Sequence, residues 1–396
     1  MSPGAALASM DNTIRADQIR ERQATTAFCF RGYNNTNLGR TPELLDHPAY
    51  GPVLEKFLLE DAEVCSEATG RKFDLIGRIR SRQESSAETF AEDIPLIVAV
   101  ERAHVAILKE FFDIDYARTR LAMGYSIGEI TALVCSGVYQ MQDLLRPLLT
   151  MADECSELAQ DVTMGVVFSR GPALDVDAVV RLCMKITAER QGVIDVSSYL
   201  APNTVLLLGQ GDTVDRFKSQ MPEALGRQIH LRKNTHKWPP LHTSLLWSRG
   251  LSNRAAAVMQ TMPGGFVAPI PPVLSLVNGK VSYNDFNSRI LLNLWVDHPQ
   301  RLWDAINELL TMGIDLMLHI GPEPNLVPAT FTRISDNVNA QLNRWSFKSN
   351  LGRRAVTGIV RRPWLSKVIS TRAAILRAPF VAHVIVEDWL LAQKVP

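Results

Sequence analysis

The stretch Leu121-Ala-Met-Gly-Tyr-Ser-Ile-Gly-Glu-Ile130 contains the pattern Gly124-x-Ser126-x-Gly128, which is typical of a nucleophile elbow. In an elbow of this kind a serine stands at a sharp turn between a strand and a helix. Glycines flank it because a Cβ there would collide with neighbouring backbone. Apolar residues precede the turn without interruption and recur at helical spacing after it. The sequence therefore predicts a strand–turn–helix unit that presents Ser126, with the N–H of Ile127 directed toward a developing oxyanion.

The same serine has a second interpretation that involves no chemistry. Ser126-x-x-Glu129 is also the pattern of a capping box, in which the serine hydroxyl satisfies a backbone N–H at the start of a helix. These few residues leave both interpretations open.

The composition is that of an ordinary globular protein, and a length of 396 residues suggests two or three domains. A net charge of +1 argues against a surface built to bind nucleic acid. The five cysteines are scattered without a C-x-x-C pair, so we expect reduced core thiols in a cytoplasmic protein, and neither disulfides nor a metal site. We expect no membrane insertion, because the sequence shows neither a signal-peptide pattern nor an apolar run of membrane-spanning length.

Between residues 163 and 234 the apolar periodicity and the chain breakers predict strands and helices in the order βαββαβ. This is the order of a ferredoxin-like unit. The expected strands are 164–169, 193–197, 204–208 and 228–231, and the expected helices are 175–190 and 212–221.

The sequence that follows Gly124 resembles the active-site segment of the malonyl-CoA:acyl-carrier-protein transacylase family. That segment has the form G-H-S-x-G-E-x-x-A-L-x-x-A-G, and residues 124–138 read GYSIGEITALVCSGV, with Tyr125 in the place of the usual histidine. More loosely, the resemblance runs from about residue 26 to residue 342. It implies an α/β hydrolase-like core made of residues 26–162 and 235–342. The ferredoxin-like subdomain of residues 163–234 would interrupt this core, in agreement with the periodicity.

The resemblance also implies a catalytic pair. Ser126 would be the nucleophile, because the family places it at the tip of the elbow, and it needs a base within hydrogen-bond reach. His242 would be that base, because the family has a histidine in a turn after the ferredoxin-like insert, and residues 240–246 occupy this place. His236, six residues earlier, is the main rival.

A second loop would complete the oxyanion hole through the N–H of Tyr33, opposite the N–H of Ile127. The family has F-x-G-Q-G-x-Q here. Gly32 matches this pattern, whereas Tyr33 and Asn34 replace a glutamine and a glycine. A backbone donor tolerates a changed side chain, so the hole can survive. Gly32 and Tyr125 are expected to contribute to the substrate site.

In the family's malonyl-using members, an arginine on the helix after the elbow pairs with the substrate carboxylate. Counting along the sequence puts Met151 in that place, and the nearest arginine, Arg146, would point about 140° away on a helix. An apolar methionine suits an acyl group without a terminal charge. Arg301 is expected to support substrate binding near the base, with a surface salt bridge as the alternative. It also remains open that Met151 only packs in the core while another cation, such as Arg301, holds a malonyl carboxylate.

Residues 343–396 lie beyond the resemblance and carry many more basic than acidic side chains. They predict a basic, mainly helical C-terminal extension. Two interpretations remain open: a terminal segment docked on the core, or a contact for an acidic carrier protein or another partner.

These observations favour an acyltransferase that moves an acyl group from acyl-CoA or an acyl-carrier protein, through a Ser126 acyl-enzyme, to the phosphopantetheine thiol of a carrier protein. Polyketide or related biosynthesis is the expected setting, with an acyl group other than malonyl. CoA or phosphopantetheine thioesters are the expected substrates, and no permanently bound cofactor is expected. Three alternatives stay open: a malonyl-CoA:acyl-carrier-protein transacylase proper, an acyl-carrier-protein thioester hydrolase that edits stalled chains, and a non-catalytic carrier-binding scaffold.

Overall fold

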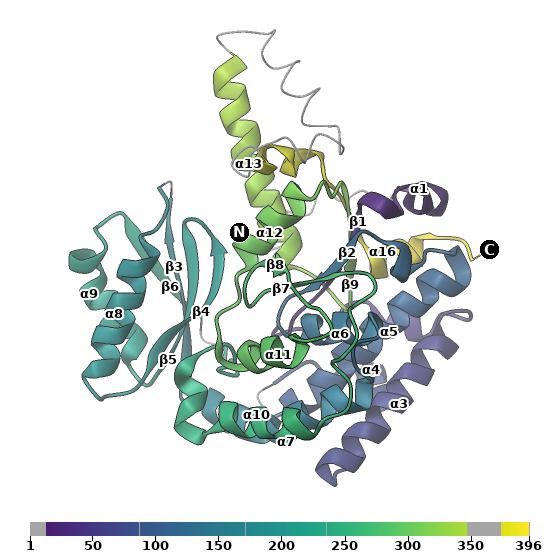
Figure 1. Ribbon diagram of the computed structural model, residues 1–396, viewed down its shortest axis with the longest axis horizontal. Helices are drawn as coiled ribbons and strands as arrows, with labels where there is room; N and C mark the ends of the chain where they lie inside the picture. Colours follow the sequence, from purple (N-terminus) through teal and green to yellow (C-terminus); the bar gives the residue numbers. More distant parts are fainter. Residues whose placement is uncertain (1–12, 87, 171, 235, 347–373, 396) are drawn as a thin grey trace.

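The centre of the fold is a six-stranded sheet with the strand order β10-β9-β1-β2-β7-β8 (Figure 1). The computed structural model describes residues 13–86, 88–170, 172–234, 236–346 and 374–395. Adjacent strands pair in parallel, except that β8 runs antiparallel to β7. The strands are β1 (Thr26–Phe30), β2 (Leu121–Gly124), β7 (Val273–Ser275), β8 (Lys280–Val281), β9 (Leu316–Ile320) and β10 (Ala382–Ile385).

Helices cover both faces of this sheet, as the residues of β1 show. Every residue of β1 is buried. Phe28 and Phe30 pack into the cluster that includes α3, α5, α6 and α7, whereas Ala27 and Cys29 pack into the cluster that includes α12 and α13. A parallel sheet covered on both faces needs such continuously apolar strands. The helices of the core are α1 (Ala16–Glu21), α2 (Thr41–Leu45), α3 (Gly51–Thr69), α4 (Leu75–Arg80), α5 (Phe90–Phe112), α6 (Ile127–Cys135), α7 (Met141–Ala159), α10 (Leu251–Thr261), α11 (Ser288–Asp297), α12 (Leu302–Thr311), α13 (Leu326–Ser346) and α16 (Val386–Ala392).

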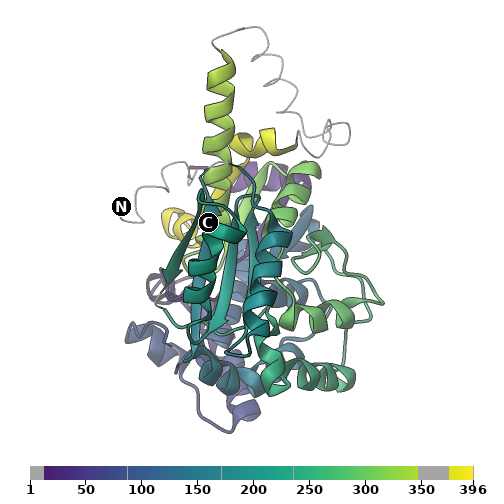
Figure 2. The same ribbon diagram turned by 90° about the vertical axis from the view of Figure 1, so that its left-hand side faces the viewer.

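A second, antiparallel sheet forms a separate subdomain beside the core, with the strand order β4-β5-β3-β6. Its helices α8 and α9 lie together on one face of this sheet (Figures 1 and 2). Order and pairing are those of a ferredoxin-like unit, so the predicted βαββαβ arrangement is confirmed. The elements are β3 (Val162–Ser169), α8 (Val176–Ala188), β4 (Ile194–Ala201), β5 (Thr204–Gln210), α9 (Thr213–Ala224) and β6 (Ile229–Asn234).

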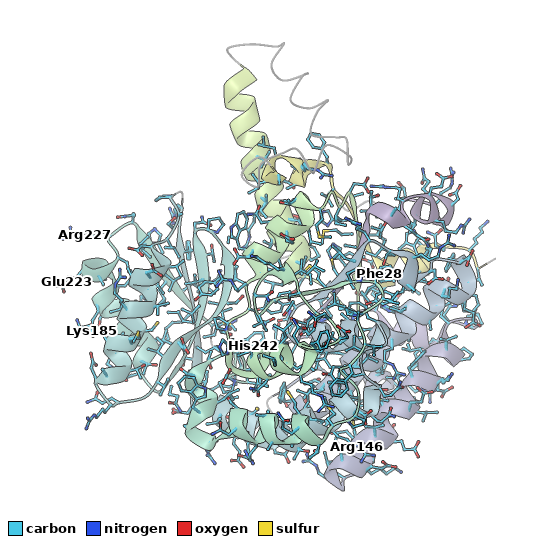
Figure 3. All side chains as sticks on the ribbon, viewed as in Figure 1. Phe28, Arg146, Lys185, Glu223, Arg227 and His242 are labelled. Atoms are coloured by element: carbon cyan, nitrogen blue, oxygen red, sulfur yellow. The ribbon has the colours of Figure 1, made fainter. Side chains whose placement is uncertain are left out.

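The edge strand β4 joins this subdomain to the core through Gln300. The Gln300 N–H donates to the Ser197 carbonyl, and the Gln300 carbonyl accepts from the N–H of Tyr199 and the hydroxyl of Ser198. Figure 3 shows His242 between the core, where Phe28 lies, and the outer helices of the subdomain, which carry Lys185 and Glu223. The junction of the two sheets is therefore where the predicted catalytic residues meet.

The described end of the C-terminal extension belongs to the core. Ala382–Ile385 is strand β10, which pairs in parallel with β9, and α16 follows it directly. Helix α13 crosses the predicted boundary at residue 343. The prediction of a mainly helical extension missed this strand, because the four residues Ala-His-Val-Ile are too few to show a periodicity. The rest of the extension, residues 347–373, lies outside the described residues. In the described part of the chain, no helix combines the length and apolarity that a membrane crossing requires.

Candidate active site

The elbow predicted around Ser126 is present between β2 and α6. Ser126 has a φ of 52°, a left-handed conformation that is strained for a serine. A Cβ on Gly124 would lie 2.0 Å from the carbonyl carbon of Gly128, and a Cβ on Gly128 would lie 2.3 Å from the Arg31 carbonyl oxygen. Neither position has room for a side chain, which explains why this turn needs both glycines.

The Ser126 hydroxyl does not cap helix α6. It lies 2.7 Å from His242 Nε2, and Ser126 makes no side-chain cap bond. Glu129, the other member of the alternative capping box, is fully buried. Its carboxylate accepts from the Tyr283 hydroxyl at 2.7 Å and from the Leu276 N–H at 3.0 Å. The capping interpretation is therefore wrong for this serine.

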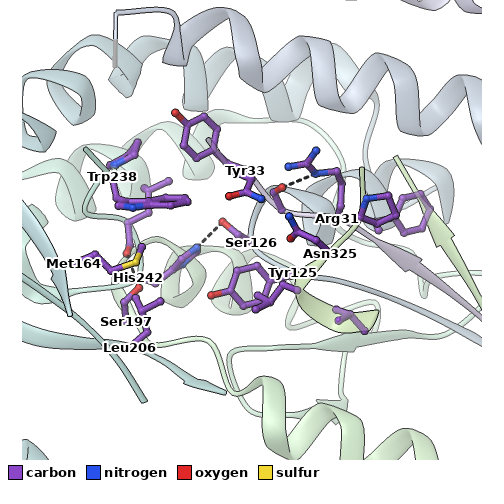
Figure 4. A pocket seen from close by; sticks show the side chains of 18 of the residues that line it. Arg31, Tyr33, Tyr125, Ser126, Met164, Ser197, Leu206, Trp238, His242 and Asn325 are labelled. Carbon is purple, nitrogen blue, oxygen red and sulfur yellow. Dashed lines mark hydrogen bonds between the residues drawn. The ribbon is translucent and has the colours of Figure 1, made fainter. Parts of the chain in front are cut away.

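The orientation of His242 is fixed from its other ring nitrogen. Nδ1 lies 2.6 Å from the carbonyl oxygen of Trp295, so Nδ1 carries the proton and donates it to this carbonyl. That tautomer leaves Nε2 as the acceptor for the Ser126 hydroxyl (Figure 4). Burial lowers the pKa of His242 to about 4, because the imidazolium form would lose its solvation. At neutral pH His242 is therefore neutral and can accept a proton.

This pKa predicts the pH dependence of any reaction that needs neutral His242. The initial rate of Ser126 acylation should be constant between about pH 6 and pH 8 and should fall roughly tenfold per pH unit below pH 4. Quenched-flow mass spectrometry over this range would measure it, with circular dichroism to confirm that the protein stays folded. A midpoint near the ordinary histidine pKa would contradict the buried environment described above.

Two further side chains hold the Ser126 backbone. The indole N–H of Trp295 donates to the Ser126 carbonyl at 3.1 Å, and the Ser126 N–H donates to Gln300 Oε1 at 3.2 Å. Gln300 Nε2 lies 3.3 Å from His242 Nδ1. Because the Nδ1 proton is directed at Trp295, we treat this last approach as a contact and not as a hydrogen bond. Trp295 and Gln300 thus fix both members of the pair, and the sequence reasoning identified neither of them.

The loop that carries Tyr33 is held by buried polar side chains. Asn37 is fully buried; its Oδ1 accepts from Arg31 Nη2 at 2.7 Å and from the Asn34 N–H at 3.0 Å. Arg31 also donates from Nε to the Gly32 carbonyl and from Nη1 to the Pro322 carbonyl. These bonds fix the loop independently of the replaced glutamine and glycine.

The predicted oxyanion donors and their neighbours lie around Ser126. Ile127 is the first residue of α6, where backbone N–H groups have no partner within the helix. Gly32 and Tyr125 are in contact, because a Cβ on Gly32 would lie 2.7 Å from the Tyr125 ring. Gly32, Tyr33 and Tyr125 all line the same cavity as Ser126. Their roles in binding an oxyanion or a substrate stay predictions.

Ser126 and His242 open into a cavity of about 200 Å³, which we call the Ser126 cavity. Its walls come from both sheets: the core provides the Tyr33 loop and Asn325, and the subdomain provides Met164 and Leu206 (Figure 4). Among the described residues, its one arginine or lysine is Arg31, whose N–H groups are bonded to Gly32, Asn37 and Pro322 as described above.

Comparison with known proteins shows which proteins this chain is similar to. No family model matches the chain. The malonyl CoA-acyl carrier protein transacylase of Haemophilus influenzae is 23% identical over 297 residues, which make up 75% of this chain and 88% of that protein. The chain is a divergent relative of these acyltransferases.

Two solved structures are similar in fold to this chain. FabD from Acinetobacter baumannii has a TM-score of 0.61 at 20% identity, covering 77% of this chain and 89% of that one. A second structure, described as a type II PKS acyl-carrier protein in complex with its malonyl-transacylase, has a TM-score of 0.59 at 19% identity. The match covers 78% of this chain and 92% of that one. Both likenesses support the α/β core with its small sheet subdomain.

In this chain, Met151 does not line the Ser126 cavity. It is buried and lines a second, smaller cavity of about 20 Å³, the Met151 cavity. Phe90 and Leu241 line both cavities, so the two are neighbours. Counting along helix α7 predicted that Met151 lies in the substrate site, whereas the structure places it in the neighbouring cavity, which shares Phe90 and Leu241 with the wall of the Ser126 cavity.

Arg301 does not point toward the catalytic pair. Its Nε donates to Asp304 at 2.6 Å on the surface, and its guanidinium lies 5.4 Å from the centre of the Tyr199 ring. The surface salt bridge, left open from the sequence, is therefore its observed interaction. Its neighbour Gln300 occupies the position beside the base, because the backbone N–H and carbonyl of Gln300 are hydrogen-bonded to the backbone of β4.

His236, the rival base, lies outside the Ser126 cavity wall. Its ring packs against Trp238 at 5.0 Å between ring centres, and the backbone N–H of His236 donates to Asn234 Oδ1. Of the two candidates, the structure therefore brings only His242 to Ser126.

Helix α16 supports the site through Glu387, whose carboxylate binds a loop next to the Ser126 cavity. Glu387 is buried, and its carboxylate accepts from the N–H of Glu323 at 2.7 Å and from the N–H of Arg40 at 2.8 Å. Glu323 immediately precedes Pro324 and Asn325, which line the Ser126 cavity. The end of the chain therefore supports a loop of the site.

Proposed function

We propose that this chain is an acyltransferase that carries an acyl group on Ser126 and passes it to the phosphopantetheine thiol of an acyl carrier protein. The observation that supports this most strongly is the contact of Ser126 Oγ with His242 Nε2 at 2.7 Å, with the opposite ring nitrogen bonded to a carbonyl. A serine becomes nucleophilic when a positioned base accepts its proton, and this arrangement provides one.

In the loading step, Ser126 Oγ attacks the carbonyl carbon of an acyl thioester. An Oγ–C bond forms, the proton moves from Oγ to His242 Nε2, and the tetrahedral oxyanion faces the N–H groups of Ile127 and Tyr33. The C–S bond then breaks, and the leaving sulfur takes the proton back from His242. The resulting imidazolium is transient and is stabilised by the Trp295 carbonyl.

The unloading step reverses these events with a second thiol. His242 removes the proton from the phosphopantetheine thiol of the carrier protein, the sulfur attacks the serine ester, and Ser126 is regenerated. No bound cofactor takes part, since CoA and phosphopantetheine enter only as substrates. The carrier protein as partner, and a setting in polyketide or related biosynthesis, are inferred from the similar proteins. The five buried or partly buried free cysteines suit the cytoplasm.

The acyl group in this proposal carries no terminal charge. The place where the family has an arginine is occupied by Met151, and Arg31, the one guanidinium in the described wall of the Ser126 cavity, is already bonded to carbonyl groups. A carboxylate buried here would lack a partner, which costs several kcal/mol. Hydrolysis and a malonyl-specific reaction remain the alternative activities, and a non-catalytic scaffold remains the third.

A panel of acyl-CoA substrates on the unmodified protein tests this proposal. Acetyl-CoA and longer uncharged acyl-CoAs should give a covalent adduct in the intact mass, whereas malonyl-CoA should load slower by at least about a hundredfold. The adduct should disappear when a holo acyl carrier protein is added, with the acyl group on its thiol. Preference for malonyl-CoA would contradict the substrate assignment. Release of free acid without carrier protein would indicate a hydrolase, and no adduct with any thioester would indicate a scaffold.

A further inference from the structure

The peptide between Gly32 and Tyr33 lies beside the catalytic serine. A Cβ on Gly32 would lie 3.4 Å from the Cβ of Ser126. Within the described residues, the structure gives neither the Tyr33 N–H nor the Ile127 N–H a hydrogen-bond partner. An oxyanion hole consists of such unbonded donors, held in a fixed direction before the reaction begins. The direction of the Tyr33 N–H therefore depends on what holds this peptide.

The side chain of Arg31 holds the other end of the same peptide. Arg31 Nε donates to the Gly32 carbonyl oxygen at 2.8 Å (Figure 4). A trans peptide is planar, and its C=O and N–H point in opposite directions. A hydrogen bond that fixes the Gly32 carbonyl therefore also fixes the direction of the Tyr33 N–H.

Arg31 is itself held in place by three further hydrogen bonds. Its side chain is only 5% exposed. Nη1 donates to the Pro322 carbonyl, and Nη2 donates to Asn37 Oδ1 at 2.7 Å and to the Thr36 carbonyl at 3.2 Å. The planar guanidinium presents its donors in a rigid fork and can satisfy all of these acceptors together, whereas a lysine ammonium is a point charge on a flexible stem.

The charge of Arg31 has no direct partner. Its four acceptors are uncharged oxygen atoms, so within the described part of the chain the guanidinium forms no ion pair. Burial lowers the pKa of Arg31, and among nearby acids Glu101 opposes this most strongly. Burial also raises the pKa of Glu101 well above its usual range, so Glu101 is uncharged at neutral pH. A positive charge next to the Tyr33 peptide favours negative charge that develops there.

Resting on the proposed function, we propose that Arg31 is a positioning residue for the oxyanion hole. It orients the Gly32–Tyr33 peptide so that the Tyr33 N–H faces the oxyanion, and its charge stabilises that anion through the same peptide. Arg31 is not a ligand of the acyl group. Its contribution is therefore the same for every acyl thioester, because each of them passes through the same tetrahedral oxyanion.

Two variants of Arg31 separate its fork from its charge. In single-turnover loading of Ser126, Arg31→Met should lower the maximal rate about a hundredfold, the size of effect expected for one lost oxyanion donor. Arg31→Lys keeps the charge but not the fork, and should load about tenfold faster than Arg31→Met. For both variants the acyl-CoA concentration that gives half the maximal rate should change by less than about threefold, since ground-state binding is not affected.

The choice of thioester distinguishes positioning from substrate binding. Acetyl-CoA and hexanoyl-CoA should lose the same factor in Arg31→Met. A native loading rate in this variant would overturn the proposal. A higher half-saturating concentration at an unchanged maximal rate would also overturn it, because Arg31 would then bind the substrate.

Arg289 provides the matched control. It too donates to backbone carbonyls, those of Met259 at 2.8 Å and Gly264 at 3.0 Å, and it does not line the Ser126 cavity. Arg289→Met should keep the native maximal rate. A loss as large as that in Arg31→Met would show a general effect of removing a loop arginine and would overturn the assignment.

A trifluoromethyl ketone gives a readout that a purely structural role would not change. Ser126 Oγ adds to the ketone carbon, its proton passes to His242, and the ketone oxygen becomes an oxyanion with no leaving group to expel. In Arg31→Met the affinity for this ketone should fall by the same factor as the loading rate. A smaller active fraction with native rate and native ketone affinity would show that Arg31 serves only folding, and would overturn the proposal.

The outcomes separate this inference from the proposed function. Loading of the unmodified protein, with a native rate in Arg31→Met, leaves the acyltransferase intact and overturns the role of Arg31. Absence of loading by every thioester on the unmodified protein overturns both. Thermal unfolding shows whether Arg31→Met folds. If it does not, Arg31→Lys decides: slower loading at an unchanged half-saturating concentration supports the proposal, and native loading overturns it.

Discussion

Ser126→Ala should abolish the covalent acyl adduct while leaving the fold unchanged. Only the hydroxyl oxygen forms the ester bond, and the alanine methyl group fits the space already occupied by the serine Cβ. The hydroxyl makes its hydrogen bond to His242 and does not cap α6, so its loss should lower the melting temperature by only a few degrees. Intact mass after incubation with acetyl-CoA or hexanoyl-CoA measures the adduct, and thermal unfolding measures the fold.

Ser197 provides the matched control. It is the other serine of the Ser126 cavity wall, and its hydroxyl donates to the Leu241 carbonyl at 3.4 Å, away from His242. Ser197→Ala should still acquire the adduct. An adduct on Ser126→Ala that disappears in Ser197→Ala would show that the nucleophile had been assigned to the wrong serine.

Sequence predicted best those features that local geometry dictates. The elbow needs glycine at positions 124 and 128 because backbone approaches both within van der Waals distance, so the pattern itself carries the structural constraint. The ferredoxin-like insert followed from periodicity and chain breakers, since amphipathic strands and helices repeat an apolar face toward one small core.

Features that depend on long-range packing were not predictable from sequence. His242 was indicated by the family resemblance; among eight histidines, no local pattern distinguishes it. Trp295 orients the base through a backbone carbonyl, which every residue type possesses, so no side-chain signal exists. Gln300 rather than Arg301 lies beside His242 because β4 fixes the backbone at residue 300, a contact about a hundred residues apart in the chain.

The residues that line the Met151 cavity could not be predicted from sequence for the same reason, because they come from distant segments. Helical spacing can tell which face of α7 a residue occupies, but not which cavity that face lines, because the other walls come from distant segments, such as those of Phe90 and Leu241. Strand β10 was missed for a related reason. A four-residue strand at the edge of a sheet is specified by its partner β9 more than by its own pattern.

The second prediction with a large effect separates the two candidate bases. His242→Ala should slow acylation of Ser126 by roughly 10²- to 10⁴-fold, the range usual for a positioned general base, because the hydroxyl proton would then have to pass to water. His236→Ala should change the rate by less than about threefold, since its ring packs against Trp238 and does not line the Ser126 cavity. Single-turnover loading by hexanoyl-CoA, followed by mass spectrometry, measures both. Histidine at 242 lies in a left-handed conformation with a φ of 63°, so His242→Asn, which tolerates this conformation better than alanine does, controls for backbone strain. A loss as large in His236→Ala as in His242→Ala, with His242→Asn active, would show that the Trp238 side of the cavity supplies the base.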